Sequence, residues 1–178
     1  MSSQQPGTGQ PGTLQALRVM AGALMGSLVV LGVIAVLIGG TWDYPPAWMA
    51  WVLGGVAVVV YGLCELLGYR APAIAPGTEA SAAMRTARTS FQTGFTLRFA
   101  LCETPALLAL VLLFVQDPPS AMTYVIGGVL ALILMAVHVW PGARVIARVE
   151  RNLDRDGGRS QLAAALRGQS PPRTGPLR

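Results

Sequence analysis

Four apolar segments constrain the fold more than any other feature of the sequence. They run over residues 17–38, 47–69, 97–115 and 121–140. A helix of about 20 mostly apolar residues is long enough to cross a bilayer. Only 12% of the residues are charged, whereas soluble domains carry about 25%. The sequence therefore predicts an all-α, polytopic membrane protein with four transmembrane helices.

The first apolar segment has to be distinguished from a signal peptide. Its apolar run is longer than the about 7–15 residues of a signal-peptide core, and no A-x-A cleavage pattern follows it. We therefore expect this segment to be retained as the first span.

The basic residues indicate how the spans are oriented. All 13 are arginines, and none lies in the connections 39–47 and 116–120. They gather instead in the connection between the second and third spans and in the tail after Trp140. Basic loops stay on the cytoplasmic side of a membrane. We therefore predict a bacterial plasma (inner) membrane protein with both termini in the cytoplasm. This placement accounts for the net charge of +5, so we expect no nucleic-acid partner.

The composition also divides the chain into regions. Residues 1–13 and 169–178 are rich in Gly, Pro and polar residues, which predicts disordered tails. Residues 14–141 form the predicted transmembrane domain. Residues 142–168 form a predicted basic, cytoplasmic helical segment.

Two segments outside the spans have the pattern of amphipathic helices. In residues 79–96, an apolar stripe excludes the arginines, and this pattern predicts a helix that lies on the cytoplasmic interface before the third span begins. Its members are Met84, Ala87, Phe91 and Phe95. In residues 142–168, apolar residues recur among arginines. That segment is interpreted either as a helix lying on anionic lipid or as a docking helix for a protein partner.

An internal repeat indicates that the four spans are two tandem helical hairpins. Three matches occur at one offset of 73 residues: Pro45-Pro46 with Pro118-Pro119, Gly54-Gly55 with Gly127-Gly128, and Glu65 with His138. Paired glycines allow helices to approach closely in membranes. We therefore expect Glu65 and His138 to lie at matching depths.

Ionisable residues within spans are candidates for function. The candidate intramembrane polar site consists of Glu103, Glu65, His138, Arg98 and Arg18. Glu103 follows Arg98 by five residues, which is about 140° round a helix, so the two form a poor intrahelical pair. We expect Glu103 to face the bundle interior and to pair with Arg18 or His138.

One helix resembles a known family. Phe91-Gln92-Thr93, followed by Ala100-Leu101-Cys102-Glu103 and a run of Ala, Leu and Val, resembles the carboxylate-bearing helix of the rotary ATP synthase c subunit. The resemblance covers residues 91–114. In that family the glutamate takes up and releases the transported proton, so the resemblance implies this role for Glu103.

The sequence gives little support to a metal site or to an enzymatic activity. Cys64, Cys102 and His138 are competent ligand types, but no C-x-x-C, H-E-x-x-H or second histidine accompanies them. We expect packing cysteines without a disulfide, and no metal or cofactor. No Ser/His/Asp set or phosphate loop is present, so no enzymatic activity is predicted.

These observations lead to two functional hypotheses. The first is a small, non-enzymatic, multi-pass membrane protein that acts as an accessory or assembly partner of a larger membrane complex. Its expected partners are the lipid bilayer, with anionic lipid at the cytoplasmic face, and other membrane proteins or further copies of itself. The alternative is a proton or ion translocator that uses Glu103 and Glu65.

Overall fold

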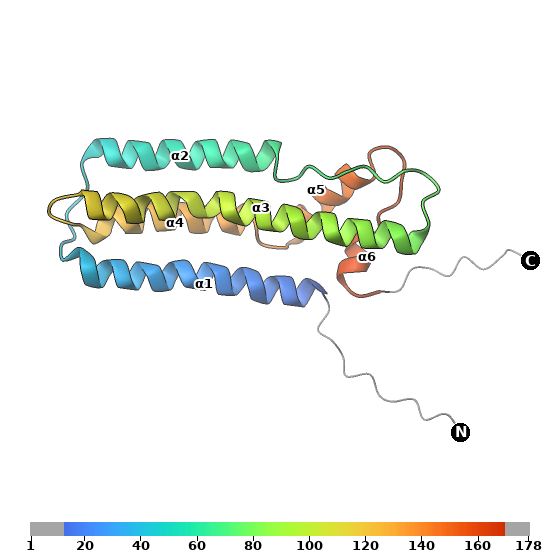
Figure 1. Cartoon of the computed structure of the whole chain (residues 1–178), viewed down its shortest axis with the longest axis horizontal. Helices are drawn as coiled ribbons and strands as arrows, with labels where there is room; N and C mark the ends of the chain where they lie inside the picture. The colour runs from blue at the N-terminus through green and yellow to red at the C-terminus, as the bar shows by residue number, and fades with distance from the viewer. Residues whose placement is uncertain (1–12, 170–178) are drawn as a thin grey trace, which may run out of the picture.

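The structure is a computed structural model that describes residues 13–169. The predicted tails, 1–13 and 169–178, lie outside this range except for Thr13 and Gln169. The helices are α1 (Thr13–Gly39), α2 (Ala47–Leu66), α3 (Ala80–Val115), α4 (Ala121–His138), α5 (Ala143–Leu153) and α6 (Leu162–Leu166) (Figure 1).

The first four helices are each long and apolar enough to cross a membrane. The described residues contain no β-strand, only an isolated bridge between Thr41 and Ser120. The predicted all-α, multi-pass membrane fold is therefore confirmed.

The four long helices do not form two equivalent hairpins. Helices α3 and α4 pack most extensively, α2 packs on both of them, and α1 packs mainly on α4. Figure 1 shows α1 and α2 on opposite sides of the α3–α4 pair. Helices α1 and α2 have no extensive contact with each other, so the tandem-hairpin prediction is not confirmed.

The glycine pairs of the repeat explain part of this difference. A Cβ atom at Gly127 would lie 2.3 Å from the Ala109 Cβ and 2.6 Å from the Pro105 carbonyl oxygen. Only glycine therefore allows α4 to approach α3 so closely. A Cβ at the matching Gly54 would meet no atom within 4 Å. The same dipeptide is a packing site in α4 and an open surface in α2.

Helix α3 continues unbroken where the sequence predicts two helices. The predicted interfacial helix at 79–96 and the third span form one helix of 36 residues, about 54 Å long at 1.5 Å per residue. Glu79 caps this helix by accepting hydrogen bonds from the backbone N–H groups of Ser81 (3.0 Å) and Ala82 (3.1 Å). A hydrocarbon core is about 30 Å thick, so the helix is longer than a span requires.

The apolar stripe at the start of α3 is buried as the pattern predicts, but not against lipid. Its four residues, Met84, Ala87, Phe91 and Phe95, are all buried. Helix α3 packs here against α5 and α6, and the Arg88 Nη2 donates to the Ala165 carbonyl at 2.8 Å. The predicted interfacial surface is therefore part of the protein core.

Helix α5 closes the same end of the bundle. Its apolar residues Val145, Val149 and Leu153 belong to the main core, and the Leu153 carbonyl accepts a hydrogen bond from the Ile74 N–H at 2.8 Å. The apolar face of segment 142–168 thus packs within the chain. From the sequence, this segment was interpreted as a helix that lies on anionic lipid or as a docking helix for a protein partner. Neither interpretation includes this packing within the chain.

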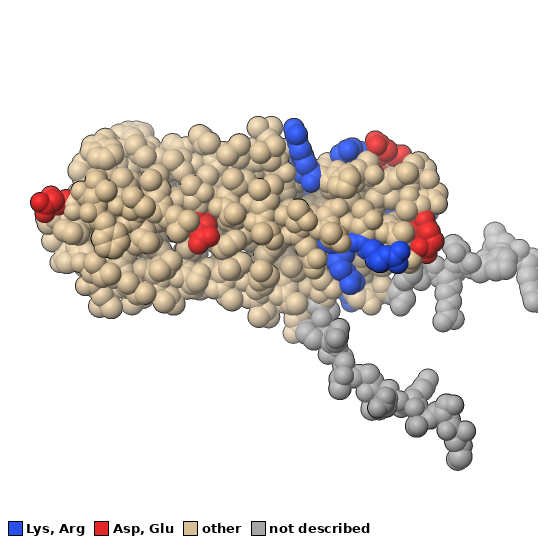
Figure 2. Space-filling model, in the orientation of Figure 1, with Lys and Arg blue, Asp and Glu red and all other residues tan. Residues whose placement is uncertain are grey.

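Charge divides the molecule into two ends. Figure 2 shows basic side chains gathered at the end that carries α5 and α6, while the long-helix bundle is largely uncharged. The two loops of the opposite end bond to each other: the Ala121 N–H donates to the Thr41 carbonyl at 3.0 Å, and the Ser120 hydroxyl to the Asp43 carbonyl at 2.5 Å. We call these the arginine-rich end and the loop end.

Candidate functional site

A set of ionisable and aromatic side chains lies inside the arginine-rich end, and we call it the polar cluster. It consists of Glu65, Tyr69, Arg98, His138 and Arg148. The chain brings it together from α2, α3, α4, α5 and the segment after α2. Three of the five sequence-predicted site residues are members.

Arg98 is the most deeply buried charge in the described chain. None of its side chain is exposed, and its Nη1 donates to the Gly68 carbonyl at 2.7 Å. Two glycines make room for it. A Cβ at Gly68 would lie 2.7 Å from the Arg98 Cγ, and one at Gly94 would lie 3.2 Å from its Nη1. Arg98 is a member of the polar site predicted from the sequence, and the structure buries it completely in the core.

Two aromatic rings lie beside the guanidinium of Arg98. Its guanidinium carbon lies 4.9 Å from the ring centre of Tyr69 and 5.6 Å from that of Phe91, which are cation–π distances. Its Nε and Nη2 have no hydrogen-bond partner, and no carboxylate within residues 13–169 forms a salt bridge with it. A buried charge without such partners is costly.

Glu65 is held by α5. The Arg148 Nη1 donates to the Glu65 Oε1 at 2.9 Å, and the Arg148 Nη2 contacts the Oε2. This two-pronged contact is the strong geometry for an arginine–carboxylate pair. The Arg148 guanidinium also lies over the Tyr69 ring, 4.4 Å from its centre. Glu65 thus ties α2 to α5.

His138 completes the cluster from α4. Its Nδ1 lies 3.0 Å from the Tyr69 hydroxyl and 3.9 Å from the Glu65 Oε1. Glu65 and His138 therefore lie at the same level of the bundle, as the repeat predicts. Burial raises the pKa of the Tyr69 phenol, and Glu65 acts in the same direction, while Arg98 and Arg148 oppose them. The phenol therefore stays protonated at neutral pH.

Glu103 and Arg18 do not join the cluster. Glu103 is partly exposed on α3 and forms no hydrogen bond or salt bridge within the described residues. Arg18 is exposed on α1 and lines a crevice of about 280 Å³ beside α5 and α6. The predicted pairing of Glu103 with Arg18 or His138 is not formed. His138 lies beside Glu65 instead.

The two cysteines meet although they are distant in the sequence. The Cys64 and Cys102 sulfurs are 3.7 Å apart, and both residues are fully buried. Within residues 13–169, no three Asp, Glu, His or Cys side chains are placed to share a metal ion.

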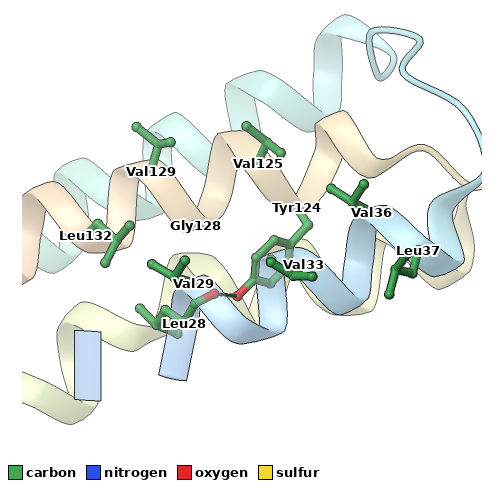
Figure 3. A pocket seen from close by; sticks show the side chains of 11 residues that line it. Leu28, Val29, Val33, Val36, Leu37, Tyr124, Val125, Gly128, Val129 and Leu132 are labelled. Carbon is green, nitrogen blue, oxygen red and sulfur yellow. Dashed lines mark hydrogen bonds between the residues drawn. The ribbon is translucent and has the colours of Figure 1, made fainter. Parts of the chain in front are cut away.

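An apolar groove runs between α1 and α4 near the loop end (Figure 3). Its volume is about 350 Å³. Its polar group, the Tyr124 hydroxyl, already donates to the Leu28 carbonyl at 2.9 Å, the dashed bond of Figure 3. The groove therefore offers apolar contact but no free hydrogen-bonding group.

Three residues of the site were not singled out from the sequence as site residues: Tyr69, Arg148 and Gly68. Tyr69 lies one turn after Glu65, which places the two side chains on the same side of the chain, and this spacing was a usable signal. Arg148 gave no such signal, because it is one of many arginines in the tail. Gly68 gave none because its role depends on Arg98.

Comparison with protein-family models, with curated proteins and with solved structures gives no significant match. The site must therefore be interpreted from its own geometry. The cluster contains an ion pair, a buried arginine and a tyrosine–histidine contact, and each of these links two elements. Together they fix α2, α3, α4 and α5 to one another.

Proposed function

We propose that this chain is a small, non-enzymatic protein of a bacterial inner membrane, and that it acts as an accessory or assembly partner of a larger membrane complex. In this proposal both termini and the arginine-rich end face the cytoplasm, since arginines gather where loops stay on that side. The exposed arginines there, including Arg70 and Arg85, attract anionic lipid headgroups.

The observation that carries the proposal is an exposed pair of glycines on α1. Gly22 and Gly26 are one turn apart and both exposed, and a Cβ at either would meet no atom within 4 Å. Small residues at this spacing allow another helix to approach closely in a membrane. Helix α1 is also the least buried of the four spans. It therefore offers a surface for a second membrane protein or a second copy of the chain.

The experiment is co-purification from native membranes in a mild detergent, with the Gly26→Leu variant beside the wild type. Leucine fills the space that a partner helix would use, so the partner should be lost while the chain itself accumulates normally. The control is Ser27→Leu, because Ser27 is also exposed but points about 100° away round the helix. Equal recovery of the partner with both variants would remove this support.

The orientation has its own test. Reporter fusions at Asp43 and Asp117 should report the outside of the membrane, and fusions at Ala75 and Gly175 the cytoplasm. A single inverted loop would contradict the proposed placement of the arginine-rich end.

A second candidate function, proton or ion translocation, is favoured by one observation. Glu103 lies within a membrane-spanning helix without an ion-pair partner in the described chain, and unpaired ionisable groups in spans mark transport pathways in many proteins. The resemblance of residues 91–114 to the ATP synthase c subunit points to the same residue. Glu65 fits this role less well, because Arg148 holds both of its carboxylate oxygens.

A further inference from the structure

Two thiols and an incompletely bonded arginine lie together between α2 and α3. The Cys64 and Cys102 sulfurs are 3.7 Å apart, and neither side chain is exposed. Each comes from a different helix, so the pair exists only because these helices pack. Both sulfurs lack other ligating side chains, since no third Asp, Glu, His or Cys within residues 13–169 completes a larger metal site.

Arg98 lies close to both cysteines along the helices that carry them. It lies one helical turn before Cys102 on α3, and its Nη1 bonds the carbonyl of Gly68, which lies one turn after Cys64. A Cβ at Gly68 would touch both the Arg98 Cγ and the Cys64 carbonyl oxygen, each at 2.7 Å. The Arg98 Nε and Nη2 are fully buried and have no partner. A buried cation with two free donors calls for a neighbouring anion.

We propose that Cys64 and Cys102 bind one Cu(I) ion as a two-thiolate site, with Arg98 as the charged donor beside it. Binding converts two thiols into thiolates: two S–H bonds break, two Cu–S bonds form, and two protons leave to solvent. Copper remains Cu(I), so no oxidant or reductant takes part. Outer-shell hydrogen bonds to ligand atoms tune metal sites, and the Nε and Nη2 of Arg98 are free to provide them.

Charge and ligand number favour Cu(I) over Zn(II). Two thiolates and one Cu(I) carry a net charge of −1, and the guanidinium brings the buried site to zero, whereas Zn(II) would leave +1. Structural zinc sites use about four protein ligands, and only the two sulfurs are present here. Soft thiolates select soft ions such as Cu(I).

The two sulfurs must move slightly apart to hold the ion. A metal–thiolate bond is about 2.3 Å, so a linear site separates its sulfurs by about 4.6 Å, roughly 1 Å more than the present distance. A disulfide would need a contraction to about 2.05 Å. Cys64 lies two residues before α2 ends at Leu66, so the site is next to the polar cluster at the arginine-rich end. This proposal replaces the expectation from the sequence that the cysteines only pack.

The test is an anaerobic titration of the full-length chain in detergent with Cu(I), in competition with the chromogenic chelator bathocuproine disulfonate. We expect one Cu(I) per chain, with two sulfur neighbours in X-ray absorption spectra. Cys64→Ser and Cys102→Ser should each abolish competitive binding, and Arg98→Gln should weaken it by about 10–100-fold, the usual effect of losing an outer-shell partner. Glu103→Gln, next to Cys102 but without a role in the site, should bind as the wild type does.

Three results would overturn the proposal. The first is the absence of competitive binding by the wild type, and the second is undiminished binding by either serine variant. The third is a copper spectrum dominated by nitrogen or oxygen neighbours. The spectrum is measured on the wild type, so it decides the question even where a cysteine variant does not fold.

Discussion

Glu65 and Glu103 are the two carboxylates within the membrane-spanning helices of the described chain, and both are partly exposed, but their ion-pair partners differ. Glu65 lies at the arginine-rich end, where Arg148 holds both of its oxygens and His138 lies 3.9 Å away. Glu103 lies on α3 with no ion-pair partner among the described residues. Figure 2 shows how little other charge the surface of the long-helix bundle carries.

These two carboxylates show that the burial of a charged side chain does not by itself determine its chemical role. The arginine-rich end combines several charges within one packed core, and each links two elements of the structure. The bundle toward the loop end is apolar, and its surface carries exposed glycines in place of charged residues. A charged residue in a membrane-spanning helix thus holds helices together where ion-pair partners surround it. Where it has no such partner, it is a candidate functional residue.

The largest expected effect concerns the packing of the arginine-rich end. Gly68→Ala places a Cβ 2.7 Å from both the Arg98 Cγ and the Cys64 carbonyl oxygen, and overpacking of this kind costs about 1–3 kcal/mol. We expect this loss in the free energy of unfolding, measured by denaturant titration in detergent micelles.

The matched control is Gly55→Ala. A Cβ at Gly55 would meet no atom within 4 Å, and alanine is the better helix former by about 0.5–1 kcal/mol. Its stability should therefore stay equal or rise. Equal losses in the two variants would show that the arginine-rich end is no more tightly packed than the surface of α2.

A smaller effect is expected at the Glu65–Arg148 pair. Glu65→Gln removes the carboxylate charge, and because both side chains are partly exposed the loss of stability should be about 1 kcal/mol. A double-mutant cycle with Arg148→Gln should give a coupling energy of about 0.5–1 kcal/mol. Glu150→Gln is the control, because Glu150 forms no salt bridge in residues 13–169. Additive effects of the two substitutions would contradict the assignment of this pair as the tie between α2 and α5.

Periodicity was sufficient to predict much of this fold. The four spans follow from apolar runs, and the stripe from Met84 to Phe95 follows from helical spacing, because both depend on residues near each other in the sequence. Helical phase does not specify which helix lies opposite Glu103, so its predicted partner was wrong.

The contacts at the arginine-rich end could not be predicted from periodicity, because they join residues that are far apart in the sequence. Arg98 is buried because Gly68 and Gly94 leave space beside it, and these glycines belong to different segments. Arg148 bonds Glu65 across 83 residues of sequence. Contacts of this range depend on how α5 folds back, which no local pattern encodes.

The central claim is that this chain acts as an accessory protein rather than as a proton translocator, and the measurement that separates the two functions most directly is proton flux through the purified chain. The protein is reconstituted into liposomes that contain a pH-sensitive dye, and a potassium gradient with valinomycin supplies the driving force. We predict that wild-type and Glu103→Gln liposomes take up protons no faster than empty ones, and that Glu103→Gln changes stability by less than about 0.5 kcal/mol, as for a side chain without partners. Proton uptake by the wild type that Glu103→Gln abolishes would contradict the account and establish translocation as the function.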